Sequence, residues 1–233
     1  AVLPLDMKAA ASIVKRENTR VAKLIGINKA ARTTCVKPAG TTSLVLGTSS
    51  GIHAWHNDYY IRRLRVGKNE AIYNYLKQNH PDLVQDEYFR PHDTAVIEIP
   101  QSAPKGSILR TESAFDLLKR VKKVATEWVK PGHRKGSNTH NVSATISLKQ
   151  EDWKKAGEWM WKNRECYNGL SVLPYDGGTY TQAPFEDITK KEFDKLISKL
   201  NSINLENVVE EVDNTDLSGE LACAGGSCEI TSL

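Results

Sequence analysis

Two cysteines close to the end of the sequence, Cys223 and Cys228, have the spacing of a redox-active pair. Gly225 and Gly226 lie between them, and glycines allow the tight turn that brings two cysteine Cα atoms within disulfide range. In an exposed tail such a pair is suited to thiol–disulfide exchange. A zinc site needs about four ligands, and no histidine or further cysteine lies nearby. We therefore expect a redox relay, the alternative being two incidental tail cysteines.

A second segment, Lys37–Ser43, has the composition of an anion-binding turn. It joins a predicted strand to a predicted helix, and the first N–H groups of a helix attract anions because they lack partners within the helix. Gly40 would let the backbone approach a phosphate closely, and a second stretch of small residues follows at 47–51. The segment lacks the Gly-Lys-Ser/Thr of a Walker motif. The alternative is an ordinary turn with a hydroxyl cap. The candidate phosphate-binding residues are Pro38, Ala39, Gly40, Thr41, Thr42 and Ser43.

Other polar stretches are less specific. Residues 138–143 and 175–180 could line a site or simply form turns. His53 and His56 flank Trp55 on a predicted loop, where we expect surface or packing roles. No pair of histidines has the spacing of metal ligands on a helix, so the sequence predicts no metal site.

The composition is that of a soluble globular protein. The chain has 233 residues, of which 39% are hydrophobic and 26% charged, and no apolar run is long enough to span a bilayer. The net charge is +4, but residues 205–233 contain seven acidic residues and no Lys or Arg, so residues 1–204 carry +11. A basic body suits phosphate-bearing ligands, although a solvated basic surface would have the same charge. Without secretory features we expect a reducing, cytoplasmic location and no membrane partner.

Hydrophobic periodicity and capping residues predict an alternation of helices and strands. This alternation indicates an α/β fold with a largely parallel sheet. Beyond residue 205 the chain is acidic and then rich in Gly and Ser, which is typical of a mobile tail. The predicted helices cover residues 6–24, 41–46, 70–78, 112–129, 150–163 and 188–200. The predicted strands cover 33–36, 59–66, 94–99 (stopped by Pro100), 142–148 and 170–173.

Several of these segments, in this order along nearly the whole chain, resemble the C-terminal part of the large catalytic chain of adenosylcobalamin-dependent (class II) ribonucleotide reductases. A glycyl-radical motif, typical of class III, is absent near the C-terminus, and the adjacent tyrosines Tyr59 and Tyr60 lie far from the tail, unlike those of class I. The matching segments are Val36–Leu44, Gly51–His53, Tyr60–Arg63, His140–Ser143, Ser171–Gly178 and Cys223 with Cys228.

The resemblance implies a ten-stranded α/β barrel, of which residues 1–204 would supply the C-terminal half, followed by a mobile acidic redox tail at 205–233. It implies that Pro38–Ser43 hold the phosphates of a ribonucleotide substrate. Cys223 and Cys228 would pass electrons from a thioredoxin-like reductant to the active-site disulfide formed in each turnover. The activity implied is conversion of ribonucleotides to 2′-deoxyribonucleotides by thiyl-radical chemistry, which serves deoxyribonucleotide biosynthesis and DNA replication.

The family's radical cysteine and its reducing cysteine pair lie upstream of the matched segments. Cys35 and Cys166 lack the Cys-x-Glu context of the radical loop, and we expect both to be buried structural thiols. Adenosylcobalamin would be bound mainly by regions outside this chain, and the missing N-terminal portion of the reductase would be a required partner. We expect no nucleic-acid partner. The alternative is a stand-alone nucleotide-binding or redox-carrier protein without reductase activity.

Overall fold

The computed structural model describes residues 5–37, 39–136, 138–175, 180–210 and 212. These residues divide into two compact units. The first unit combines residues 1–55 with 107–175, and the second combines 56–106 with 176–233. The segment predicted as one body, 1–204, therefore contributes to two units, each built from two stretches of sequence.

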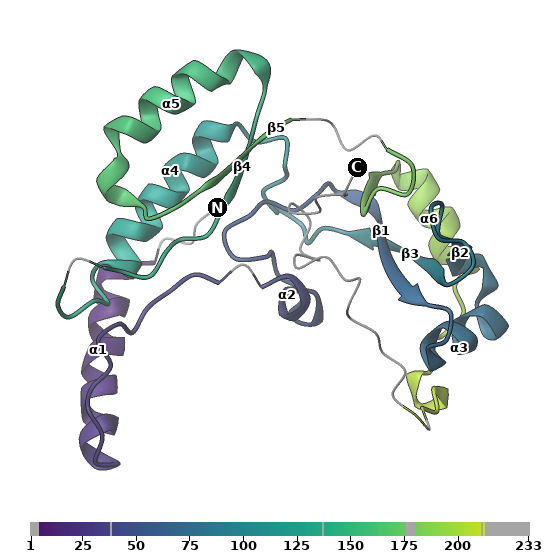
Figure 1. Cartoon of the computed structure of the whole chain (residues 1–233), viewed down its shortest axis with the longest axis horizontal. Helices are drawn as coiled ribbons and strands as arrows, with labels where there is room; N and C mark the ends of the chain where they lie inside the picture. The colour runs from purple at the N-terminus through teal and green to yellow at the C-terminus, as the bar shows by residue number, and fades with distance from the viewer. Residues whose placement is uncertain (1–4, 38, 137, 176–179, 211, 213–233) are drawn as a thin grey trace. The chain divides into compact units, whose positions relative to one another are not determined.

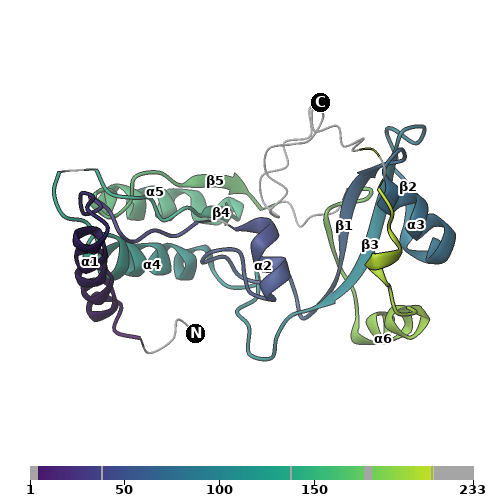
Figure 2. The ribbon, with the colours of Figure 1, turned by 90° about the horizontal axis from the view of Figure 1, so that it is seen from below.

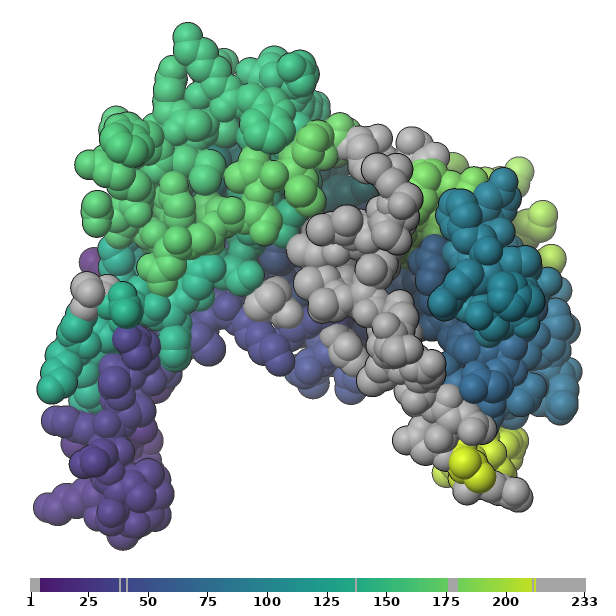
Figure 3. Space-filling view, in the orientation of Figure 1, coloured from purple at the N-terminus to yellow at the C-terminus, as the bar shows by residue number. Residues whose placement is uncertain are grey.

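The first unit packs helices against a short parallel strand pair (Figure 1). Its helices are α1 (Met7–Leu24), α2 (Gly40–Leu46), α4 (Ala114–Val124) and α5 (Trp153–Lys162), with short 3-10 turns at Gln150–Asp152 and Arg164–Cys166. The strands β4 (Thr145–Leu148) and β5 (Ser171–Pro174) pair in parallel from Thr145 opposite Ser171. The core lies where α4 meets β4, with Leu118, Val121 and Ile146 almost completely buried. In Figure 3 the residues of α4 and α5, coloured teal to green, form one continuous body.

Side-chain capping explains where α1 and α4 begin. The Asp6 carboxylate accepts a hydrogen bond from the Ala9 N–H at 2.9 Å, which satisfies one unpaired donor of the first turn of α1. Ser113 does the same for α4, accepting from the Asp116 N–H at 3.2 Å. At its other end α4 widens into a π-helical turn at Ala125–Val129.

The second unit is built on an antiparallel sheet with the order β2-β3-β1-β6 among the described residues. Its strands are β1 (Tyr59–Gly67), β2 (Val84–Asp86), β3 (Thr94–Ser102) and β6 (Phe185–Asp187). The helices α3 (Ala71–Asn79) and α6 (Lys190–Lys199) lie beside β1 and β3 (Figure 2), and 3-10 turns cover Pro81–Leu83 and Leu205–Asn207. Side chains alternate across the sheet, so Val66 and Ile97 join the apolar core while Arg63 pairs with Glu98 at 2.6 Å on the other face.

The mixed α/β character is confirmed, but three details of the prediction are wrong. The larger sheet is antiparallel, and only β4 and β5 form a parallel pair of named strands in the described part of the chain. Residues 33–36 form no strand; isolated bridges occur at Val36 and at the preceding Arg32 instead. Pro100 does not stop β3, because β2 pairs only with Ala95–Ile97 and leaves an edge that a residue without an N–H can occupy. The described residues form no closed barrel, so the ten-stranded barrel is not confirmed.

Candidate functional site

The predicted anion-binding turn lies at the start of α2 in the first unit. Ala39 is the N-cap residue, and its methyl side chain cannot cap the first turn. Ser43 is buried, and its hydroxyl donates to the Gly40 carbonyl at 2.9 Å, so that proton is used within the helix. Thr42 is exposed. Pro38 and the side chain of Thr41 lie outside the described residues.

The second stretch of small residues turns the chain back toward this segment. Gly47 ends α2 in the left-handed conformation at φ +60°, and the Thr48 N–H donates to the Ser43 carbonyl at 2.9 Å. Gly51 also has a positive φ of +58°, and a Cβ on it would lie 3.0 Å from the Lys37 carbonyl oxygen. Glycine is therefore required at position 51 both for its backbone angle and for its close approach to the residue that precedes the turn.

His53 connects this loop to the parallel strands. Its Nδ1 lies 2.8 Å from the Ser50 carbonyl oxygen, and its Nε2 lies 3.1 Å from the backbone nitrogen of Thr145, the first residue of β4. Sequence reasoning gave His53 only a surface or packing role. The signal was its place in the Gly51–His53 motif, but nothing in the sequence showed its partner at position 145.

The buried ion pair between Arg120 and Glu112 holds the backbone of Ile52. Arg120 on α4 donates to both carboxylate oxygens of Glu112, at 3.0 and 2.5 Å, and also to the Ile52 carbonyl at 3.1 Å. The two side chains are 11% and 13% exposed. A charge pair this deeply buried stays formed, because separating it would leave an uncompensated charge. The sequence gave no indication of this pair.

The polar stretch at 138–143 lies between two other loops of the same unit. Val36 and Val142 form a parallel bridge, and the His140 Nδ1 lies 3.0 Å from the Thr34 carbonyl oxygen. On the other side, the Asn141 side chain exchanges hydrogen bonds of 2.9 and 3.3 Å with the backbone of Gly169. These bonds join the loops that precede β4 and β5. The other polar stretch, 175–180, is described only at Tyr175 and from Tyr180 onward.

The cysteines differ from expectation. Cys223 and Cys228 lie outside the described residues. Cys35 and Cys166 are both free thiols, but Cys35 is exposed and Cys166 only half-buried, so the prediction of two buried thiols is wrong. The backbone at Cys35 is fixed by the Trp128 indole N–H, which donates to its carbonyl at 3.1 Å. The backbone of Cys35 is therefore fixed although its side chain is exposed.

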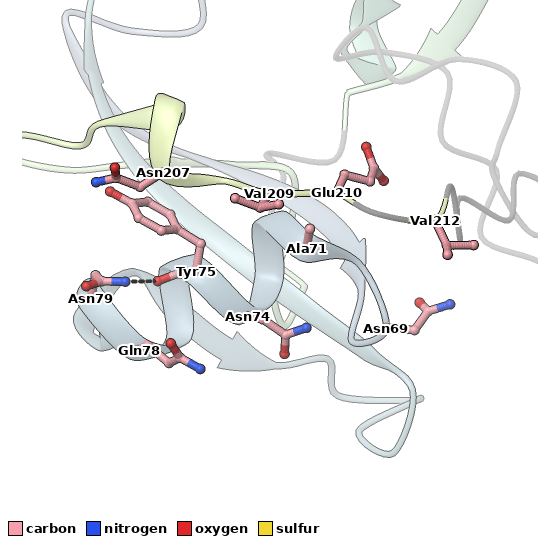
Figure 4. A pocket seen from close by; sticks show the side chains of 10 residues that line it. All are labelled: Asn69, Ala71, Asn74, Tyr75, Gln78, Asn79, Asn207, Val209, Glu210 and Val212. Atoms are coloured by element: carbon pink, nitrogen blue, oxygen red, sulfur yellow. Dashed lines mark hydrogen bonds between the residues drawn. The ribbon is translucent and has the colours of Figure 1, made fainter.

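The second unit carries a polar groove along α3 (Figure 4). Its volume is about 560 Å³, and amide side chains dominate its lining. The segment that follows the 3-10 turn at Leu205–Asn207 forms its other wall. The residues around the groove are Asn69, Ala71, Asn74, Tyr75, Gln78, Asn79, Asn207, Val209, Glu210 and Val212.

Ion pairs and ring packing involve several titratable side chains of the second unit. The Lys68 ammonium lies 2.6 Å from Asp86, and its hydrogen bond holds the pKa of that carboxyl below its usual value. His56 lies 3.0 Å from Asp187 and stacks on Phe185, in agreement with the packing role predicted for it. Within the described ranges, no three His, Cys, Asp or Glu side chains gather as metal ligands. No helix in the same ranges combines the length and apolar character needed to cross a membrane.

Comparison with known proteins gives a consistent group of relatives, although no family model matches the chain. The adenosylcobalamin-dependent ribonucleoside-triphosphate reductase of Lactobacillus delbrueckii subsp. bulgaricus is 27% identical over 217 residues, which is 89% of this chain and 28% of the relative. The reductases of the same name from Lactobacillus leichmannii and Euglena gracilis are also 27% identical, over 89% and 85% of this chain.

The fold comparison agrees. The crystal structure of a B12-dependent (class II) ribonucleotide reductase has a TM-score of 0.68 to this chain at 24% identity, covering 86% of this chain and 28% of the other. At that identity the match supports the fold alone. The chain spans little more than a quarter of the length of the relatives it matches. Over most of its length this chain is thus similar to one segment of the adenosylcobalamin-dependent, class II ribonucleotide reductases, which confirms the resemblance identified from its motifs.

Proposed function

We propose that this chain is the C-terminal portion of an adenosylcobalamin-dependent ribonucleotide reductase, which converts ribonucleotides to 2′-deoxyribonucleotides by thiyl-radical chemistry. The observation that carries the proposal is the similarity to reductases of that name over 89% of the chain. The chain also carries the motifs at the start of α2, before β4 and from β5 onward in the order expected for the family. Because the relatives are named triphosphate reductases, a ribonucleoside triphosphate is the first substrate to test.

In this proposal the segment Pro38–Ser43 binds the substrate phosphates. The start of α2 has no side-chain cap at Ala39, which leaves its first backbone N–H groups for a ligand. Gly40 has no side chain to keep a phosphate away from the backbone. The Ser43 hydroxyl donates to Gly40, so its contribution is to the shape of the turn. The backbone would thus supply more of the binding than the hydroxyls do.

Cys223 and Cys228 supply the reducing equivalents. Loss of the 2′-hydroxyl as water takes two electrons from a thiol pair at the active site, which becomes a disulfide. The tail dithiol reduces this disulfide by thiol–disulfide exchange and becomes a disulfide itself. A thioredoxin-like protein then returns the tail to the dithiol. The segment 205–233 is rich in Gly and Ser near the cysteines, and the mobility that this composition predicts would suit the transfer.

The rest of the catalyst would lie outside this chain. We propose that β4 and β5 are parallel strands of the ten-stranded barrel, whose radical cysteine belongs to the missing N-terminal portion. Adenosylcobalamin, when bound, supplies radical initiation. The described residues gather no set of metal-ligating side chains, and the groove along α3 is lined mainly by amides. We therefore assign adenosylcobalamin binding mainly to regions outside this chain.

The test uses a full-length reductase that carries this chain. Cys223→Ser and Cys228→Ser should each lower thioredoxin-driven multiple turnover by two orders of magnitude or more, because the relay needs both thiols. A small dithiol that enters the barrel directly should restore part of the activity. Normal thioredoxin-driven turnover in both variants would overturn the tail assignment. If no full-length form reduces ribonucleotides, yet the chain alone binds nucleotides, the stand-alone alternative is favoured.

A further inference from the structure

We infer that His53 and the Arg120–Glu112 pair are positioning residues that fix the segment Lys37–Ser43 for substrate binding. The inference rests on the proposed phosphate-binding role of that segment. None of these three side chains needs to touch the substrate. They act through the loop at residues 47–53, which the structure ties to three other parts of the first unit.

The contacts of His53 define the roles of its two ring nitrogens. A backbone N–H can only donate, so the Nε2 that lies 3.1 Å from the Thr145 nitrogen accepts. A carbonyl oxygen can only accept, so Nδ1 donates to the Ser50 carbonyl at 2.8 Å. The ring thus bridges the loop to the first residue of β4, 92 positions further along the chain. Neither bond can be replaced by an apolar side chain.

Arg120 holds the adjacent residue from the other side. Its guanidinium is oriented by two bonds to Glu112, and the same Nη1 that donates to Glu112 also donates to the Ile52 carbonyl. A planar guanidinium with five N–H groups can make these bonds at once, whereas a lysine ammonium acts as a point charge. Because the pair is buried, the position of Ile52 is set by α4.

Gly51, next to Ile52, contacts the backbone of the binding segment. Its Cα lies so close to Lys37 that an added Cβ would be 3.0 Å from the Lys37 carbonyl oxygen. At the other end of α2, the Thr48 N–H donates to the Ser43 carbonyl at 2.9 Å. The loop that His53 and Arg120 fix therefore packs closely against Lys37 and is hydrogen-bonded to Ser43, the two ends of the binding segment. A shift of that loop would move the backbone N–H groups proposed to bind phosphate.

The first experiment compares three histidine variants in the full-length reductase. His53→Ala should raise the KM for the ribonucleotide roughly five- to thirtyfold, as the loss of one or two hydrogen bonds predicts. The kcat should change much less. His53→Gln should stay within roughly threefold of the parent, because its amide oxygen can accept from the Thr145 N–H. His133→Ala is the control, since His133 bonds to the Gly136 carbonyl at 3.0 Å, away from the loop.

Arg120→Lys gives a second measurement if His53→Ala fails to fold. It keeps a positive charge for Glu112 but cannot hold both Glu112 and the Ile52 carbonyl in one geometry, so the KM should again rise. A folded His53→Ala or Arg120→Lys enzyme with an unchanged KM would overturn the inference. Ala39→Asp tests the phosphate assignment separately, because a carboxylate at the N-cap of α2 would compete with the phosphate. If Ala39→Asp weakens binding and His53→Ala does not, only the positioning inference fails.

Discussion

At the scale of single residues, the packing of the first unit requires a glycine at position 132. Gly132 follows the π-helical turn and lies against Thr34, which is 3% exposed. The Thr34 hydroxyl donates to the Trp128 carbonyl at 2.8 Å, and its side chain fills the space beside the glycine. The sequence predicts a strand at 33–36 because Thr and Val favour strands. In the structure, the Thr34 hydroxyl bond to Trp128 and isolated bridges replace the regular backbone hydrogen bonds of a sheet.

Gly132→Ala should therefore destabilise the protein. The new Cβ would lie 1.9 Å from the Thr34 Oγ1 and 2.7 Å from its Cβ, so the backbone must move. We expect a loss of about 1–3 kcal/mol, as for other overpacked sites. Gly157→Ala, in the middle of α5 with nothing within 4 Å of the added Cβ, should instead gain about 0.5–1 kcal/mol. Urea unfolding of both variants checks this, and equal midpoints would contradict the packing argument.

At the scale of elements, the sequence predicted helices much better than sheet order. The helix predicted from Asp6 begins as expected, with Asp6 as its cap, whereas the helix predicted from residue 112 begins at Ala114 after a cap by Ser113. Alternating helices and strands suggested a parallel sheet, yet β1 and β3 are antiparallel, with α3 and the short β2 between them in sequence. For the candidate site, likewise, the local motif could be recognised from the sequence, but its long-range contacts could not. The Gly51–His53 motif was visible, but the bonds of His53 to Thr145 and of Arg120 to Ile52 depend on folding.

The attachment of the tail is also an element-scale feature. Leu200 packs against the core of the second unit, and the Asn204 N–H donates to the Tyr75 hydroxyl on α3 at 3.1 Å. Beyond this point, the N–H groups of Glu206 and Asn207 donate back to Asn204 and that of Val208 donates to Leu205. Leu205 and Val209 are exposed. Figure 4 shows this segment above the groove along α3. The Asn204 bond therefore ties the chain to α3 immediately before residue 205, from which we predict the tail.

Tyr75→Phe should release this attachment without disturbing the core. The ring still packs, but the Asn204 N–H loses its acceptor, so its amide hydrogen exchange should accelerate roughly two- to tenfold. Tyr73→Phe is the matched control, because Tyr73 packs against the same core from α3 without a bond to Asn204. Exchange measured by mass spectrometry or NMR decides the point. An Asn204 amide that already exchanges as fast as those of residues 205–210 would contradict the attachment.

At the scale of the whole molecule, several large apolar side chains of the first unit are exposed, two of them adjacent in sequence. On α2 the exposed fractions of Val45 and Leu46 are 82% and 67%, and that of Trp161 on α5 is 72%. The strands β4 and β5 pair only with each other among the described strands, so their two-stranded sheet is smaller than the barrel proposed for the reductase. These features agree with the proposal that this chain is one portion of a larger reductase.

The 233 residues expressed alone should therefore self-associate and bind a hydrophobic dye, and the N-terminal portion of the reductase should suppress both effects when the two are co-expressed. The reason is that burial of exposed apolar surface contributes roughly 25 cal/mol per Å², whichever chain covers it. Sedimentation velocity and co-purification measure the two outcomes. Val45→Lys in the isolated chain should reduce self-association, while Lys29→Arg, at an exposed position that is already charged, should not. A monomeric isolated chain that unfolds cooperatively and binds nucleotide at micromolar concentration would contradict the larger assembly and favour a stand-alone binding protein.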